Sequence, residues 1–142
     1  MINVFLDTNI IIDFLDINRQ NHSKAVELIK FLNEKDYQIY ISEDMLSTIY
    51  YLIKDKSKVL LFLKDILNLW NVVGFDKDVI NAAIEKSLSE NYDFEDLLQC
   101  FCAKKYRCII VTNDKTFVNC GVKVIGYEEF LINGELRMEN GE

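Results

Sequence analysis

Three acidic features of the sequence follow or open elements that are otherwise mostly apolar. Asp7 comes directly after the apolar run Val4-Phe5-Leu6, Asp114 follows a β-branched run, and Asp96 closes the stretch Asp93-Phe94-Glu95-Asp96. Carboxylates gathered at close range repel one another, and a cation is needed to keep them all ionised. Oxygen ligands suit Mg²⁺ or Mn²⁺ better than zinc. The residue types therefore predict a metal site built from Asp7, Asp96 and Asp114.

The chemistry that such a site allows is hydrolysis of a phosphodiester. A bound divalent cation lowers the pKa of a water molecule, clamps the phosphate and stabilises the leaving oxygen. This chemistry requires no histidine base, and His22 is the only histidine in the chain.

Each acidic residue also has a purely structural interpretation. Asp93 and Asp96 are spaced as in a capping box, so Asp93 is expected to cap a helix and Asp96 to favour its positive end. Asp7 and Asp114 could each begin a turn. The prediction of a site depends on these residues sharing one edge of the fold.

Strands and helices are expected to alternate along the chain. The strands are predicted at Ile2–Leu6, Gln38–Ile41, Asn71–Phe75, Cys108–Thr112 and Val122–Ile125. The helices are predicted around Ile10–Leu15, after the caps Ser23 and Ser42, at Val59–Leu69, from Asp76 or Asp78, from Asp93 to about Lys105, and as a final turn at Tyr127–Leu131. This alternation predicts an α/β fold with a mostly parallel central sheet of about five strands and helices on both faces. Sites in such sheets form beyond the carboxyl ends of the strands, where the three acidic features would meet.

Length and composition indicate one globular domain. The chain has 142 residues, of which 50% are hydrophobic and 27% charged, and we expect a domain over residues 1–132 with a flexible tail at 133–142. The net charge of -7 argues against a protein that simply coats nucleic acid, but not against a nuclease whose acidic pocket holds metal. No apolar stretch approaches the ~20 residues of a membrane span, and the opening MINVFLDTN carries no basic leader. We therefore expect a cytoplasmic protein without a membrane partner.

The four cysteines are Cys100, Cys102, Cys108 and Cys120, and none forms a CxxC pair. A zinc site would need better-placed ligands. We expect all four to be reduced thiols packed as small hydrophobic side chains.

The sequence resembles the PIN-domain family, especially the VapC-type toxins and related small bacterial PIN proteins. The resemblance runs from Ile2 to about Leu131 and rests on three motifs: Val4-Phe5-Leu6-Asp7-Thr8-Asn9, Asp93-Phe94-Glu95-Asp96 and Thr112-Asn113-Asp114. The ending Val124 to Leu131 is also similar to the last strand and turn of the family.

The resemblance implies a three-layer αβα PIN-like fold and metal-dependent cleavage of RNA. Carried over by position, Asp7, Asp96 and Asp114 would be the catalytic metal ligands for Mg²⁺ or Mn²⁺. Auxiliary roles would fall to Asp93 as a further acid and to polar side chains that orient water or a carboxylate, namely Thr8, Asn9 and Thr112. The family also implies an RNA substrate, an antitoxin protein as partner and a homodimer, so that this chain would be the toxin of a type II toxin–antitoxin pair.

The sequence departs from the family at one position. The helix expected after the second strand usually carries an acidic residue, and the matching residue here is the uncharged Thr48. Asp44 lies one turn earlier and could partly substitute for it. Thr48 leaves open an alternative: a catalytically weak or inactive PIN domain that binds RNA or protein. A phosphoacceptor signalling domain is disfavoured, because Asp7 is followed by Thr8 and not by a second acid.

Overall fold

The computed structural model describes residues 1–130 of the chain. Five strands form a single sheet in which every pair is parallel: β1 (Asn3–Leu6), β2 (Gln38–Ser42), β3 (Asn71–Val73), β4 (Cys108–Val111) and β5 (Val124–Ile125). The predicted α/β class and central sheet are confirmed. The tail predicted at 133–142 lies outside the described residues.

The strand order in the sheet is β3-β2-β1-β4-β5. Val4 of the central strand β1 pairs with Ile39 on one side and with Ile109 on the other. The chain first winds outward from β1 to β3 and then returns to the other side of β1 for β4. The carboxyl ends of β1 and β4 therefore mark the point where the winding direction reverses, which is the usual place for a site in an open α/β sheet.

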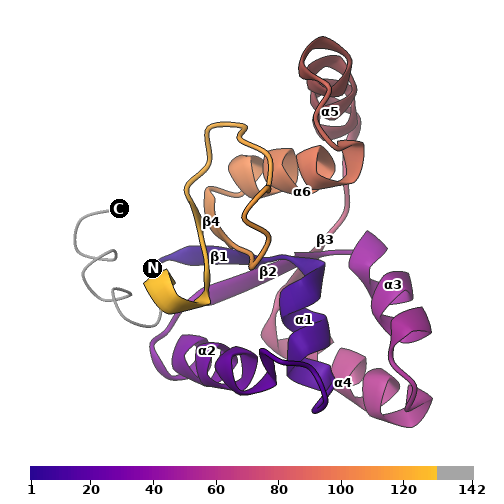
Figure 1. Ribbon diagram of the computed structural model, residues 1–142, viewed down its shortest axis with the longest axis vertical. Coiled ribbons are helices and arrows are strands. Elements are labelled where there is room, and N and C mark those ends of the chain that lie inside the picture. Colours follow the sequence, from indigo (N-terminus) through magenta and orange to yellow (C-terminus); the bar gives the residue numbers. More distant parts are fainter. Residues whose placement is uncertain (131–142) are drawn as a thin grey trace.

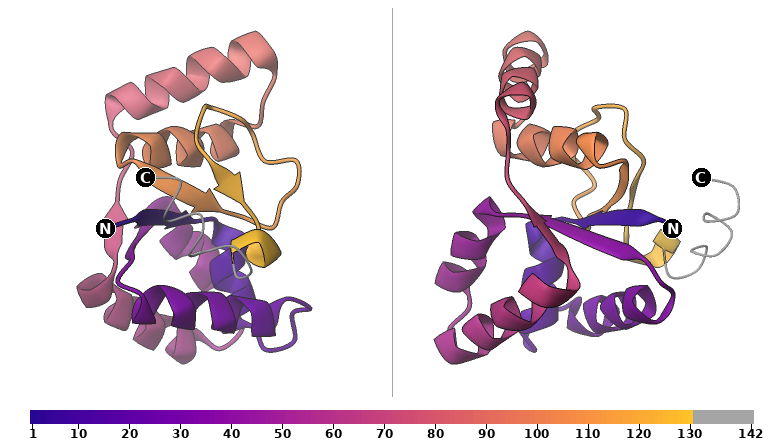
Figure 2. Two further views of the ribbon diagram at one scale, coloured as in Figure 1. Left: turned by 90° about the vertical axis from the view of Figure 1, so that its left-hand side faces the viewer. Right: turned by 180° about the vertical axis from the view of Figure 1, so that it is seen from behind.

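Helices cover both faces of the sheet and give it the expected three layers (Figures 1 and 2). One face carries α1 (Thr8–Leu15), α2 (His22–Glu34), α3 (Asp44–Leu52) and α4 (Lys56–Leu69). The other carries α5 (Lys77–Glu90) and α6 (Phe94–Lys105). No helix within residues 1–130 is long and apolar enough to cross a membrane.

The core lies on both sides of β1. Val4, Phe5 and Leu6 are all fully buried, because a strand covered by helices on both faces has no side turned to water. The apolar face predicted for the second helix, Ala25, Leu28, Ile29 and Leu32, is also buried. Complete burial of an aliphatic side chain contributes about 1.5–3 kcal/mol, so this layer positions the ends of β1 and β4 rigidly.

Asp13 is a charged residue inside this apolar layer, with only 4% of its surface exposed. Its carboxylate accepts hydrogen bonds from Arg19 Nε at 2.9 Å and from the Tyr127 hydroxyl at 2.8 Å. Tyr127 belongs to a helical turn at residues 127–130. This agrees with the final turn predicted at Tyr127–Leu131, of which residue 131 lies outside the described residues. Asp13 thus anchors this last turn to α1.

Two predicted helix caps are wrong. The second helix begins at His22 after Asn21, so Ser23 lies inside it; the Nδ1 atom of His22 lies 2.9 Å from the carbonyl oxygen of Asp13. Ser42 is the buried last residue of β2, and its hydroxyl donates to the side chain of Asp44. The pairing of Ser42 with Val73 keeps Ser42 in the sheet, and the contact of His22 with Asp13 lies where the second helix begins, so tertiary contacts override the local capping preference.

The expectation of four reduced thiols is wrong for two of the cysteines. Cys100 on α6 and Cys120, which follows β4, form a disulfide with a Cα–Cα distance of 6.2 Å, within the range that the bond can span. They are 20 residues apart in sequence and meet only because the chain returns over α6 after β4. Cys102 and Cys108 are free and buried, as expected.

Candidate active site

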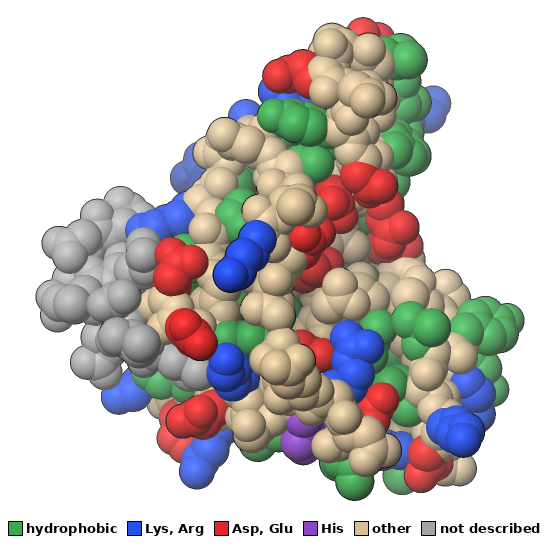
Figure 3. Space-filling model, viewed as in Figure 1, with side chains coloured by type: hydrophobic (Ala, Val, Ile, Leu, Met, Phe, Trp, Pro, Cys, Tyr) green, Lys and Arg blue, Asp and Glu red, His purple; other side chains and the backbone are tan. Residues whose placement is uncertain are grey.

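A pocket of about 600 Å³ opens at the carboxyl ends of the strands, where the winding of the sheet reverses. Acidic side chains gather in a hollow between α5 and α6 above and α3 below (Figure 3). The lining residues predicted from the sequence are Asp7, Thr8, Asn9, Thr48, Asp93, Asp96 and Asp114. The three carboxylates proposed as ligands therefore face one pocket, although they lie far apart along the chain.

Asp7 is held in place by the end of β1 and the start of α1. It is 7% exposed, its Oδ1 accepts a hydrogen bond from the Thr8 amide at 2.8 Å, and its Oδ2 accepts one from the Thr112 hydroxyl at 2.7 Å. Burial raises the pKa of Asp7, and the two hydrogen bonds oppose that shift because they stabilise the charged form. The carboxylate is thus oriented while its negative charge is only partly compensated.

Asp96 lies in the first turn of α6. Asp93 caps this helix, as predicted, by accepting a hydrogen bond from the Asp96 amide at 3.0 Å. Burial, followed by the charges of Asp93, Asp7, Asp114 and Glu95, raises the pKa of Asp96 to about 6. Because the charges of Asp7 and Asp114 help to raise this pKa, the three carboxylates are close enough to repel one another.

Asp114 is positioned by the turn that follows β4. Its Oδ1 accepts hydrogen bonds from the Thr116 amide at 2.9 Å and the Thr116 hydroxyl at 2.7 Å. The Asp114 amide donates to the Thr112 hydroxyl oxygen at 3.1 Å, and that hydroxyl in turn donates to Asp7. Thr112 is buried, and through these two bonds it couples the end of β1 to the turn after β4.

The remaining predicted residues differ in their placement. Thr48 lines the pocket, but its hydroxyl contacts the Asp44 carbonyl oxygen of its own helix at 3.5 Å. Asp44 is not among the lining residues. It lies in the first turn of α3, where its negative charge interacts favourably with the positive end of the helix dipole. Its charge does help to raise the pKa of Glu95, after the larger effect of burial.

The lining residues that were not predicted include Glu95 and Gln99. Glu95 was noted only as part of the acidic stretch, yet it lines the pocket beside Asp96. Gln99 lines the pocket one turn after Asp96 and is 2% exposed. Its Nε2 donates to Thr8 Oγ1 at 3.3 Å, and its Oε1 has no hydrogen-bond partner within residues 1–130. The only sequence signal for Gln99 is a polar residue interrupting the apolar run Leu97-Leu98 and Cys100.

The donor set suits a hard cation, but it is not a preformed cage. Within residues 1–130, no three His, Cys, Asp or Glu side chains are grouped closely enough to hold a metal ion. Repulsion between carboxylates favours such an open arrangement. Mg²⁺ is usually held by one or two carboxylates and several waters, so it does not require all three side chains to touch it. Gln99 Oε1 is a further buried oxygen acceptor on a residue that lines the same pocket.

The fold and the pocket together define an α/β protein with oxygen donors collected at the switch point of a parallel sheet. The family model for the PIN domain matches residues 4–123, and the chain belongs to this family. The family suggested by the sequence motifs is therefore confirmed.

The chain is similar to Ribonuclease VapC1 of Aquifex aeolicus (strain VF5), with 36% identity over 132 residues that cover 89% of this chain and 92% of the relative. Among solved structures it is similar to VapC20 of Mycobacterium tuberculosis, described as a sarcin-ricin loop cleaving toxin, with a TM-score of 0.67, 17% identity, and coverage of 84% of this chain and 95% of the other. It is also similar to VapBC2 from Rickettsia felis bound to a promoter DNA fragment, with a TM-score of 0.68, 18% identity, and coverage of 88% and 98%. At these identities the two structures support the fold alone.

Proposed function

We propose that this protein is a metal-dependent endoribonuclease and the toxin of a type II toxin–antitoxin pair. The observation that carries the proposal is the convergence of Asp7, Asp96 and Asp114 on one pocket at the switch point of the sheet. The similarity to a ribonuclease over most of the chain supports RNA as the substrate. RNA as the substrate would make the cytoplasm its place of action.

The oxygen donors of the pocket fit Mg²⁺ or Mn²⁺. Asp7, Asp96 and Asp114 would hold the cation, directly or through water, with Gln99 Oε1 accepting a hydrogen bond from a water molecule. When bound, the metal supplies an activated water and charge stabilisation for phosphodiester hydrolysis. Thr112 and the Thr8 amide keep Asp7 oriented and favour its charged form.

Asp96 and Glu95 would adjust the charge of the pocket. Without metal, burial and the neighbouring carboxylates raise the pKa of Asp96 to about 6, and a bound cation would favour its charged form. Glu95 is a further carboxylate at the pocket wall, and we propose that it supplies negative charge that Thr48 does not.

The test is cleavage of labelled single-stranded and structured RNAs in Mg²⁺ or Mn²⁺. The variant Asp7→Asn should lose at least ~100-fold in rate, because it removes the charge at the centre of the site. Asp65→Asn removes an equal charge from an exposed position on α4 and should cleave like the wild type. Equal metal-dependent cleavage by wild type and Asp7→Asn would contradict the nuclease proposal.

The alternative is a PIN domain that binds RNA or protein without cutting RNA, and Thr48 is the observation that favours it. In that case RNA would bind wild type and Asp7→Asn with similar affinity, and neither protein would cleave the RNA with any added divalent cation. Measuring binding and cleavage on the same RNA separates the two functions.

A protein partner is the second part of the proposal. Several structurally similar chains come from toxin–antitoxin complexes, including one from Klebsiella pneumoniae. On α5, Ile80, Ile84 and Leu88 recur every fourth residue and are 37%, 41% and 79% exposed, which is an apolar stripe that a partner would cover. We propose that the protein forms a homodimer and binds a cognate antitoxin, and that exposed apolar surfaces such as this stripe are covered in these contacts. Light scattering on wild type and Leu88→Lys, with and without a co-expressed antitoxin, would test this; a monomer in every sample would contradict it.

A further inference from the structure

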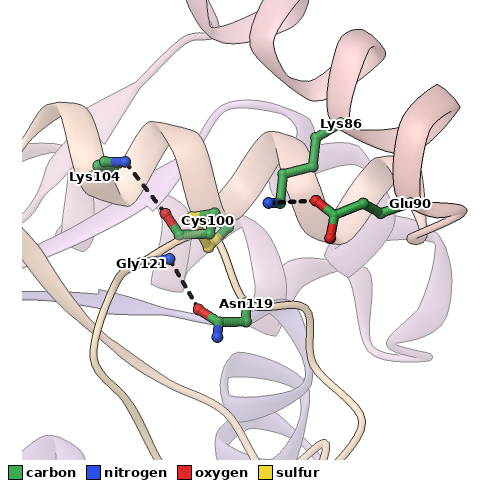
Figure 4. Close-up of a disulfide and its surroundings, with 7 residues drawn as sticks. Lys86, Glu90, Cys100, Lys104, Asn119 and Gly121 are labelled. Carbon is green, nitrogen blue, oxygen red and sulfur yellow. Dashed lines mark hydrogen bonds and ion pairs between the residues drawn. A yellow bond between two sulfur atoms is a disulfide. The ribbon is translucent and has the colours of Figure 1, made fainter.

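The disulfide joins two chain segments that supply different walls of the acidic pocket. Cys100 lies on α6 one turn after Asp96, and Cys120 lies in the segment 112–123, which carries Asp114 and contains neither helix nor strand. We call this segment the 112–123 loop. Figure 4 shows the sulfur–sulfur bond between the middle of α6 and the loop. The bond thus connects the segment of Asp96 covalently to that of Asp114.

The other contacts between the loop and α6 near this bond are weaker. The Lys104 ammonium donates to the Cys120 carbonyl oxygen at 3.3 Å, but the lysine is exposed, so water competes for it. The hydrogen bond from the Gly121 amide to Asn119 lies within the loop and does not tie it to the helix. Val118 is 5% exposed and packs into the core. Without the disulfide, apolar packing would be the main restraint on this part of the loop.

We propose that the Cys100–Cys120 bond is a reversible redox switch that sets the affinity of the pocket for a divalent cation. In the disulfide form the loop is held against α6, and Asp114 faces the same pocket as Asp96. In the dithiol form only noncovalent contacts hold the loop, among them the hydrogen bond from the Asp114 amide to Thr112, and repulsion among the carboxylates shifts the Asp114 side chain away from the other two. The cation is taken from the proposed function, whereas the release of the loop does not depend on it.

The redox step needs only a thiol–disulfide partner. A small dithiol attacks the Cys120 sulfur, which is the more accessible one because Cys120 is 6% exposed and Cys100 is 0% exposed. The Cys100 thiolate leaves and takes up a proton; the second thiol of the reductant then closes its own disulfide and releases Cys120 as a thiol. Two electrons and two protons pass to the protein in total, and a small-molecule disulfide such as a tripeptide disulfide takes them back in the reverse direction.

The two free cysteines do not compete in this exchange. Burial raises the pKa of Cys102 to about 11 and of Cys108 to about 12, so both remain protonated at neutral pH. Exchange requires a thiolate, and these two side chains are therefore poor attacking groups. In reducing compartments, the disulfides that do occur are usually transient or redox-sensing.

The experiment compares oxidised and reduced full-length protein after removal of the small thiols. Peptide mapping without reductant should find Cys100 linked to Cys120 in the oxidised sample, and hydrogen exchange in residues 112–123 should be faster after reduction. Mn²⁺ binding, followed by electron paramagnetic resonance, should be about five- to tenfold weaker in the reduced form, at the low end of coupling between linked sites. The double variant Cys100→Ser/Cys120→Ser should bind like the reduced form under both conditions.

The matched control is Cys102→Ala/Cys108→Ala, which removes two buried thiols and keeps the disulfide. It should retain the full difference between the two redox forms. Equal Mn²⁺ affinity and equal exchange in both forms of the wild type would overturn the switch, as would failure of the bond to form with the small-molecule disulfide. If neither form binds Mn²⁺, the proposed metal-dependent function fails. Hydrogen exchange in the 112–123 loop then decides by itself whether the disulfide restrains the loop.

Discussion

The hydrogen bond from Thr112 to Asp7 allows a quantitative test of how the pocket is held together. Thr112→Val keeps the shape of the side chain and removes the hydroxyl, which donates to Asp7 Oδ2 at 2.7 Å. Thr112 is only 3% exposed, so water cannot replace this donor. A hydrogen bond to a charged group contributes about 1.5–3 kcal/mol, and its loss leaves a buried carboxylate oxygen without that donor. For a chain of this length each kcal/mol lowers Tm by roughly 3 °C, so the expected loss is about 5–9 °C.

The control is Thr116→Val, because the Thr116 hydroxyl donates to Asp114 Oδ1 at the same distance of 2.7 Å but is exposed. Water replaces that donor at little cost, and the free energy of unfolding should fall by less than about 1 kcal/mol. Both variants are measured without metal at pH 7.5 by thermal and urea denaturation. If Thr112→Val lost no more stability than Thr116→Val, burial would not be what gives the Thr112–Asp7 bond its strength.

Three further changes probe the pocket and its support. The pKa of Asp96 is raised from 3.8 to about 6 in the folded protein, so the stability that its proton contributes is present at low pH and is lost as the pH rises through 6. The Tm of the metal-free wild type should fall between about pH 4 and 6, and Asp96→Asn should reduce that fall, whereas an identical pH dependence would show that Asp96 titrates normally. Thr48→Glu should tighten Mn²⁺ binding and raise the cleavage rate by about tenfold if the missing charge limits activity; unchanged binding by calorimetry would reject this explanation. Tyr127→Phe removes the buried hydroxyl that donates to Asp13, and urea denaturation should give a loss of about 1.5–3 kcal/mol; no loss would mean that Arg19 alone satisfies the carboxylate.

The fold was predictable because local patterns and tertiary structure agree. Each predicted strand is a short apolar run, and each lies in the sheet with bounds that differ by a few residues. Parallel strands put their carboxyl ends at one edge, so the meeting of Asp7 with Asp114 followed from the order of elements. Asp96 could be added because its helix directly precedes β4.

The parts that sequence reasoning missed depend on contacts between distant segments. The disulfide between Cys100 and Cys120 has no spacing signal, because the two residues belong to separate elements and meet only after β4 is placed. The burial of Asp13 was equally hidden, since a charged residue near the end of a helix is normally exposed. Gln99 escaped notice because a single polar residue in an amphipathic helix usually faces water.

The order of the strands also limits when the pocket can exist during synthesis. Asn3 of β1 pairs with Gln38 on one side and with Cys108 on the other. The ribosome adds residues at about 5–20 per second, so β1 waits roughly 5–20 seconds for β4. Once β2 and β3 have been made, a nascent chain can assemble them with β1, but the edge of β1 that will pair with β4 stays exposed to chaperones or to other chains. Asp7 meanwhile has no Asp114 beside it, so a partly made polypeptide carries no complete acidic pocket.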